Sequence, residues 1–406
     1  MRKSIENILV ALFSLACLLG FDGKASALVV DGAAVEDLIL EADRIIHGAV
    51  VRKRVEKNPT SGRVWTVYSI APFASRGHTM SSGAAIDVRL PGGTHDGLRH
   101  WVPGIPELAV GAEAWWLLER VSDAWVPVGY RLGVLTVTAA PGPGIINGYV
   151  HVNSLAGEPV RWEKSCLSWY LDLADYSAIS RQEVVAALEP SFEVWNQVAG
   201  AYPRWQFAGA TCADGVGKEP NGVRNVVVFR SAPGSWPHPQ RVIALTSISV
   251  DDGTGFIVDA DVEVNAVTQR LSVTGDPNAF DLRQVATHEV GHMLGLDHTP
   301  VAEAVMFGTT LVGERDNYEL HPDDDNGLSA SHPLSEASES TPCAPADVFT
   351  VDAPYCPASD DGCATTGGLG FPVPLALWLG CAWFFVRIRR PDPVPADVSS
   401  PPRQPV

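Results

Sequence analysis

The first third of the chain alternates short apolar runs with turn residues. Strands are predicted where β-branched and aromatic residues cluster: Ile45–Lys53, Val64–Ile70, Ala85–Leu90, Ala114–Arg120 and Trp125–Val137. Glycine and proline steps separate these runs, as is usual between strands. Residues 28–140 are therefore predicted to form a small all-β domain, a barrel or a sandwich, with an OB-like barrel as one form. Nothing in this stretch indicates what the domain does.

From residue 161 onward, strand patterns mix with helical ones. Strands are predicted at Cys166–Ala174, Arg204–Ala208 and Val223–Phe229. The third is continuously apolar, which favours a central position in a sheet. Arg181–Val198 carries apolar residues at helical spacing, and Ser180 stands where it can cap the helix. The Pro/Gly-rich residues 141–160 are predicted to be a linker to this second domain, which spans 161–330.

One later strand has an unusual pattern. Phe256–Asn265 alternates apolar residues with Asp259, Asp261 and Glu263. A solvated strand face is the favoured interpretation. The alternative is a calcium site that includes Asp259 and Asp261, because calcium prefers hard oxygen ligands.

The amino-terminal end reads as an export signal. Two basic residues precede the apolar run Ile8–Phe21, and Ala25-Ser26-Ala27 offers a small-residue cleavage site. Residues 1–27 are therefore predicted to be a secretory signal peptide. A lone membrane anchor is the alternative, but the apolar run is short for a membrane span.

The carboxy-terminal end has three parts. Residues 331–362 are rich in Ser, Pro, Asp and Ala and are predicted to be a flexible stalk. Residues 363–390 contain the apolar stretch Leu369–Val386, close to the minimum length for a bilayer, followed by three arginines. Residues 391–406 form a proline-rich tail. Membrane contact is expected through the apolar segment.

Composition narrows the class of protein. The 406 residues are 46% hydrophobic and 19% charged, which is typical of a globular protein. The formal charge of −18 argues against a nucleic-acid partner, because phosphate binding requires clustered Lys and Arg. Five of the seven cysteines lie outside the two apolar ends. Two local disulfides plus one remaining cysteine is the simplest assignment for an exported protein, and the pairing stays open.

The most specific pattern is His-Glu-Val-Gly-His-Met-Leu-Gly-Leu-Asp-His at 288–298. On a helix, His288 and His292 are one turn apart and can reach one metal ion. Gly295 permits the left-handed turn that returns His298 as a third ligand. Three protein ligands and an open position are typical of a catalytic zinc. Glu289 stands beside the metal, where it can act as general base and then general acid.

These residues resemble the extended zinc signature of the metzincin metalloproteases. Met306, in Ala304-Val305-Met306-Phe307, stands at the spacing of the methionine turn in the matrixin branch. Two positions depart from the usual matrixin pattern. Thr299 stands where matrixins usually have serine after the third histidine, and Phe307-Gly308 replaces the usual Met-x-Pro continuation of the methionine turn. The resemblance implies an α+β, layered catalytic domain with a mixed twisted sheet and a zinc-binding helix. It also implies that Met306 packs beneath the ligands.

The same resemblance assigns a role to the strand before the zinc helix. By that likeness, Phe256–Asn265 is expected to be the edge strand that pairs with extended substrate. Many matrixin proenzymes cover the zinc with a propeptide cysteine, but there is no cysteine between Ala27 and Cys166. A thiolate from residues 28–140 is therefore excluded, and any inhibition by that domain must cover the cleft or use another ligand.

The carboxy-terminal segment resembles a second known pattern. Gly362-Cys363, the apolar stretch and the arginine cluster are similar to sorting tails processed by myxosortase-type enzymes. That resemblance implies a sorting enzyme as partner and Cys363 as the residue that carries the surface anchor. A simple membrane-spanning anchor is the alternative, and it leaves the enzyme on the same side of the membrane.

The sequence thus predicts a secreted, cell-surface-anchored zinc endopeptidase that acts on protein or peptide substrates. Zn²⁺ is the expected cofactor, with calcium as a second candidate. Two other functions are retained for comparison. One is a non-catalytic surface binding protein with a structural zinc, and the other is a metal-dependent cell-wall amidase.

Overall fold

The computed structural model describes residues 30–31, 35–59, 61–73, 84–136, 148–173, 176–211, 225–315 and 317–337. All of them fall within one compact unit, residues 1–358. The predicted signal peptide, most of the predicted stalk, the predicted sorting segment and the proline-rich tail lie outside the described residues. Within the described residues, no helix is long and apolar enough to cross a membrane.

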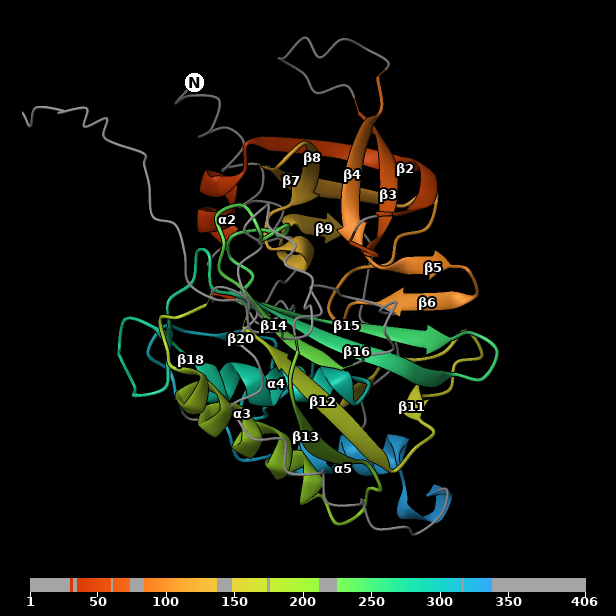
Figure 1. Cartoon of the computed structure of the whole chain (residues 1–406). Coiled ribbons are helices and arrows are strands. Elements are labelled where there is room, and N and C mark those ends of the chain that lie inside the picture. The colour runs from red at the N-terminus through yellow and green to blue at the C-terminus, as the bar shows by residue number, and fades with distance from the viewer. Residues whose placement is uncertain are drawn as a thin grey trace, which may run out of the picture. The chain divides into compact units, whose positions relative to one another are not determined.

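A mixed sheet, called the main sheet below, organises the second half of the chain (Figure 1). In the described residues it has eight strands, seven of them in the order β13-β12-β14-β16-β15-β6-β5, with β11 pairing β16. The strands from β11 to β16 are Arg161–Trp162, Cys166–Asp172, Arg204–Ala210, Val226–Arg230, Ala244–Asp251 and Phe256–Asn265. β15 runs antiparallel to β16, whereas β11 to β14 are parallel to their neighbours. The apolar strand β14 is central, as its sequence predicted.

The prediction that Phe256–Asn265 is an edge strand is wrong. This strand, β16, pairs with β14 on one side and with β15 on the other. The strand next to β16 on that other side is β15, which runs antiparallel to it and was not predicted from the sequence. β15 is not an edge either, because β6 (Leu98–Trp101) pairs with it and continues through a hairpin to β5 (Gly93–His95). The acidic residues of β16 are therefore interior to the sheet.

Two helices cover one face of the main sheet (Figure 1). α3 (Arg181–Asn196) begins with a capping box between Ser180 and Glu183, which satisfies two backbone amides at its first turn. α4 (Leu282–Met293) packs against α3 and β15. Between the helices and the sheet lies a core that includes Phe192, Trp195 and Val262. The helical spacing in the sequence predicted α3 to within two residues, because the expected helix Arg181–Val198 ends two residues beyond the observed Asn196.

The earlier part of the chain forms a second sheet, called the N-terminal sheet. Its order is β2-β3-β4-β8-β7-β9. An additional pairing between β2 and β7 joins β2, β3, β4, β8 and β7 into a closed ring of strands. The strands are Arg44–Lys57, Val64–Pro72, Ile86–Pro91, Glu113–Val121, Ala124–Pro127 and Val134–Thr136, numbered β2, β3, β4, β7, β8 and β9. Trp125–Val137 is not one strand as predicted. Gly129 and Tyr130 have φ values of 54° and 55°, so the chain turns and a short 3-10 helix, Tyr130–Gly133, separates β8 from β9.

Short elements complete the described fold. Helix α2 spans Val35–Glu41, β1 (Val30–Asp31) pairs with β20 (Thr309–Thr310), and β17 (Leu271–Ser272) pairs with β18 (Phe280–Asp281). β10 (Val150–His151) pairs with β19 (Leu296–Asp297), directly before His298. The segment predicted as a linker contributes Val152 and Val160 to the main core. Helix α5 (Pro322–Ser331) and the 3-10 helix Leu334–Glu336 end the described chain.

Candidate metal centre

Helix α4 carries the first two histidines on one face. Asp281 caps the helix by accepting a hydrogen bond from the amide of Gln284 at 3.1 Å. The helix ends at Met293, and Gly295 then adopts φ 81°, the left-handed conformation that its sequence position predicted. A side chain at Gly295 would also press on Val160, whose Cγ2 would lie 3.0 Å from a Cβ. The turn returns the chain as β19, which leads into His298.

The structure brings His288, His292 and His298 together. The Nε2 atom of His298 lies 3.2 Å from Nε2 of His288 and 3.2 Å from Nε2 of His292. Two ligands of one tetrahedral zinc are expected about 3.3 Å apart, given zinc–nitrogen bonds of about 2.0–2.1 Å. These three are the only group of metal-ligating side chains of this kind within the described residues.

Each helical histidine is oriented by a backbone carbonyl. Nδ1 of His288 lies 2.7 Å from the carbonyl oxygen of Val305, and Nδ1 of His292 lies 2.8 Å from that of Leu296. A proton on Nδ1 leaves Nε2 as the free, ligating nitrogen. Burial lowers the pKa of His292 to about 4 and that of His288 well below its ordinary value. Both rings are therefore neutral near pH 7, as metal binding requires.

Glu289 is buried beside this cluster, with 1% of its surface exposed. The hydroxyl of Thr246 on β15 donates a hydrogen bond to its Oε2. Burial raises the pKa of Glu289 to about 7, although hydrogen bonds from Thr246 oppose the shift. A carboxyl group with a pKa near neutrality can both accept and release a proton at physiological pH.

The donor set fits a zinc ion. Three imidazoles present ligating nitrogens at the spacing that one ion requires, and the site is buried. In addition, Oε1 of Glu289 is buried and has no hydrogen-bond partner among the described residues. A buried polar atom without a partner is unfavourable, and a metal-bound water would satisfy it.

Met306 packs under the helix that carries the ligands. It is 2% exposed, and its sulfur would lie only 2.2 Å from a Cβ at Gly291. Glycine between the two helical histidines is therefore needed for this close approach. Sequence reasoning did not assign a role to Gly291, although glycine inside an otherwise helical pattern is a signal of close packing.

Asp324 holds the methionine turn in place and was also missed. Its carboxylate accepts the amides of Val305 at 2.9 Å and Met306 at 3.1 Å. Asp324 also accepts the amide of His321 at the start of α5, as part of a capping box. It therefore caps α5 and fixes the backbone next to the carbonyl of Val305 that orients His288.

Asp259 and Asp261 do not lie on a solvated face, so the favoured interpretation of that strand is wrong. Both are 2% exposed and Glu263 is 1% exposed. Asp259 accepts the amide of Asn225 at 3.2 Å, and Asp261 accepts that of Val226 at 2.8 Å. The carboxylates thus hold the start of β14 against β16. The structure places them away from the histidine cluster, on the opposite face of the main sheet.

The cysteines are described only in part. Cys166 is disulfide-bonded, and the other six cysteines, Cys363 included, lie outside the described residues.

Comparison with known proteins places this site in a family. Residues 234–332, which contain β15, β16, α4 and the methionine turn, match the family model for matrixin. The chain is 29% identical over 170 residues to human matrix metalloproteinase-19, covering 42% of this chain and 30% of that protein. It is 26% identical over 205 residues to human neutrophil collagenase, covering 48% of this chain and 39% of that protein.

A plant relative shares a shorter region. Over 79 residues the chain is 38% identical to metalloendoproteinase 2-MMP of Arabidopsis thaliana, covering 20% of this chain and 18% of that protein. The chain thus spans well under half the length of each of these relatives. The matrixin family implies dependence on zinc and calcium. The family match, together with the mixed sheet and the histidine cluster on α4, identifies the region around residues 234–332 as matrixin-like and metzincin-like.

Proposed function

We propose that this chain is a zinc-dependent endopeptidase that hydrolyses peptide bonds in protein or peptide substrates. The observation that carries the proposal is Glu289, which directly follows the candidate ligand His288 on α4, is 1% exposed, and has a carboxylate oxygen, Oε1, without a hydrogen-bond partner among the described residues. A purely structural metal site needs no such base, which argues against a non-catalytic binding protein.

His288, His292 and His298 would hold the zinc ion. Zinc would supply a Lewis acid that polarises the scissile carbonyl and lowers the pKa of a bound water. Glu289 would accept a proton at Oε1 from the attacking water and later deliver it to the leaving amine. Thr246 fixes the other oxygen of the carboxylate, Oε2, and leaves Oε1 free to exchange a proton. Met306 supports the ligands by packing and takes no part in the chemistry.

The test is the variant Glu289→Ala, measured for zinc content and for cleavage of fluorescein-labelled casein. Zinc should remain at one ion per chain, while cleavage should fall by at least about 10²-fold, the usual contribution of a general base. Glu303→Ala is the matched control, because Glu303 is exposed in the loop between His298 and Met306. Full activity of Glu289→Ala would rule out the mechanism.

Secretion and surface anchoring are part of the proposal and depend on the two ends of the chain. The sorting-tail hypothesis expects the mature protein to end near Cys363 and to carry its anchor there. Mass spectrometry of the membrane-associated protein, with Cys363→Ala as comparison, tests this. A mature chain that retains residues 364–406 would support the simple membrane anchor instead.

A further inference from the structure

The outer edge of β15 is occupied by a hairpin from the N-terminal half of the chain. β6 pairs antiparallel with β15 through four residues: Trp101 opposite Ile248, His100 opposite Ser249, Arg99 opposite Val250 and Leu98 opposite Asp251. In the described residues, β6 is the only strand on this edge, and the stretch Ala244–Ser247 has none. The sheet is therefore extended by a strand almost 150 residues distant in sequence.

This edge leads directly to the candidate metal centre. Thr246, which holds Glu289, lies two residues before Ile248, the first residue of β15 that pairs with β6. Beyond β6, the amide of Gly104 donates to the Asp297 carboxylate at 3.1 Å, and Asp297 is the residue before His298. Residues 98–104 thus run along β15 and then reach the segment that carries the third histidine. An extended peptide that paired with the whole of this edge, from Ala244 to Asp251, would need the space that β6 occupies beside Ile248–Asp251.

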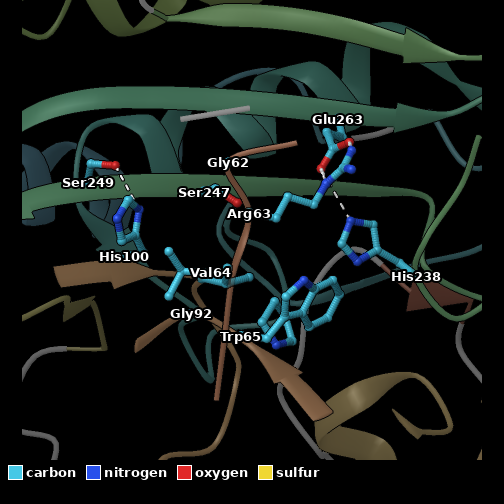
Figure 2. Close-up of a pocket in the computed structure, with 12 residues that line it drawn as sticks. Gly62, Arg63, Val64, Trp65, Gly92, His100, His238, Ser247, Ser249 and Glu263 are labelled. Atoms are coloured by element: carbon cyan, nitrogen blue, oxygen red, sulfur yellow. Dashed lines mark hydrogen bonds and ion pairs between the residues drawn. The ribbon is translucent and has the colours of Figure 1, made fainter. Parts of the chain in front are cut away.

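Side chains of the hairpin strengthen its attachment. His100 Nδ1 lies 3.1 Å from the Ser249 hydroxyl, as Figure 2 shows, and Arg99 Nη1 donates to the carbonyl of Asn153 at 3.0 Å. Trp101 packs against the core of the main sheet, but its Nε1 is buried without a hydrogen-bond partner among the described residues. That unsatisfied donor makes the docked state of the hairpin less favourable than its packing suggests.

A buried ion cluster next to the hairpin fixes the N-terminal sheet to the main sheet. Arg63, in the turn between β2 and β3, pairs with Glu263 on β16 (Figure 2). Arg230 reaches the same carboxylate at 2.7 Å and His238 at 3.2 Å, while Tyr130 contacts His238 at 2.7 Å. This cluster does not involve β5 or β6. The N-terminal sheet therefore has an attachment to the main sheet that does not depend on the pairing of β6 with β15.

We propose that the outer edge of β15 is a strand-docking surface for which the hairpin β5–β6 and an extended polypeptide substrate compete. Strand addition to an exposed edge is a common way of binding extended peptides, since backbone hydrogen bonds supply much of the affinity. The hairpin covers Ile248–Asp251 in the absence of substrate and must leave β15 before an extended peptide can pair with the full length of the strand. The proposal rests on the proposed peptidase function and adds a specific intrachain competitor that uses no cysteine.

The test locks the hairpin in place. Ser249→Cys combined with His100→Cys puts two cysteines directly opposite each other on adjacent antiparallel strands, a separation that a disulfide can bridge. The single variants Ser249→Cys and His100→Cys are the controls. They report any effect that the oxidant or reductant has on the enzyme or on the native disulfide without the new cross-link. Cleavage of fluorescein-labelled casein is measured for each oxidised and reduced full chain at equal zinc content. We expect kcat/KM of the oxidised double variant to fall at least tenfold and to recover on reduction.

A second variant loosens the hairpin. Trp101→Ala removes its packing on the core, so kcat/KM should rise severalfold above that of the wild type. Equal activity of the oxidised and reduced double variant would overturn the proposal, because the locked hairpin would then be a permanent strand of the sheet. Absence of cleavage by every zinc-loaded form, Trp101→Ala included, would instead contradict the peptidase function, and the competition inference would fall with it.

Discussion

The hydroxyl of Thr246 on β15 donates a hydrogen bond to the carboxylate of Glu289 on α4, across the boundary between sheet and helix. Both residues are almost completely buried, at 0% and 1% exposure. The contact fixes one carboxylate oxygen and leaves Oε1 as the group that can receive a proton. Thr246 is therefore a positioning residue, which acts on the reaction through Glu289.

Replacement of Thr246 by valine should lower kcat by about tenfold, a part of the usual contribution of a general base. Valine keeps the shape of threonine but cannot donate a hydrogen bond, so KM and zinc content should change little. Thr246→Ser restores the hydroxyl and should recover most of kcat. Steady-state kinetics on a fluorogenic peptide would show the difference. A parallel loss of kcat in both variants would point to packing as the cause.

Glu263 is the second residue whose partners lead to a prediction. Burial alone would raise its pKa, but the attraction of Arg63, the hydrogen bond from His238 and the attraction of Arg230 together hold the pKa well below its ordinary value. Glu263→Gln leaves two guanidinium groups largely buried beside a neutral side chain. Loss of one member of a buried ion pair costs about 3–5 kcal/mol. Urea unfolding at pH 7 should show a decrease of that size.

The matched control for Glu263→Gln is Lys53→Met. Lys53 and Glu107 form an ion pair with side chains that are 29% and 54% exposed. Exposed pairs contribute about 0.2–1 kcal/mol. A decrease below about 1 kcal/mol in Glu263→Gln as well would mean that the cluster does not fasten the N-terminal sheet to the main sheet.

Calcium binding by Asp259 and Asp261 is open to a direct test. The carboxylates accept backbone amides at the start of β14, so Asp261→Asn should lower the melting temperature even without calcium. If these residues also bind calcium, added calcium should raise the melting temperature of the wild type more than that of Asp261→Asn. An equal rise in both would place the calcium site elsewhere.

Sequence patterns within short segments correctly predicted those elements whose formation depends on residues close together in the chain. The helical spacing and Ser180 predicted α3, and the histidine spacing with Gly295 predicted the helix and turn of α4. Such signals are contained in segments of about a dozen residues. The closeness of the three histidines follows from the same local geometry.

The errors came from partners that are distant in sequence. The acidic face of β16 looked solvated because nothing near it in the sequence shows that Arg63, 200 residues earlier, reaches Glu263. The same strand looked like an edge because neither β15 nor the hairpin that covers β15 was predicted. Gly291 and Asp324 were missed because their roles depend on contact with Met306 and its backbone.

His332 gives a prediction for the pH dependence of stability. It follows α5 at the end of the catalytic domain, is 0% exposed, and its Nε2 accepts the amide of Trp162 at 3.0 Å. Burial, assisted by repulsion from His151 and Arg161, lowers its pKa to about 3 from the ordinary 6.5. Between these values the unfolded chain binds a proton that the folded chain does not. The contribution to stability is therefore complete above pH 6.5 and is lost as the pH falls towards 3, by at most about 1.4 kcal/mol per pH unit.

His332→Gln isolates this contribution, because glutamine can accept the Trp162 amide but does not titrate. The free energy of unfolding in urea, measured from pH 7 to pH 4.5, should fall more steeply for the wild type than for the variant. The gap between the two curves should open below pH 6.5 and widen steadily, since each further pH unit favours protonation of the unfolded wild type alone. Parallel curves over that range would show that His332 binds a proton equally well in both states, which is incompatible with its role as an acceptor for Trp162.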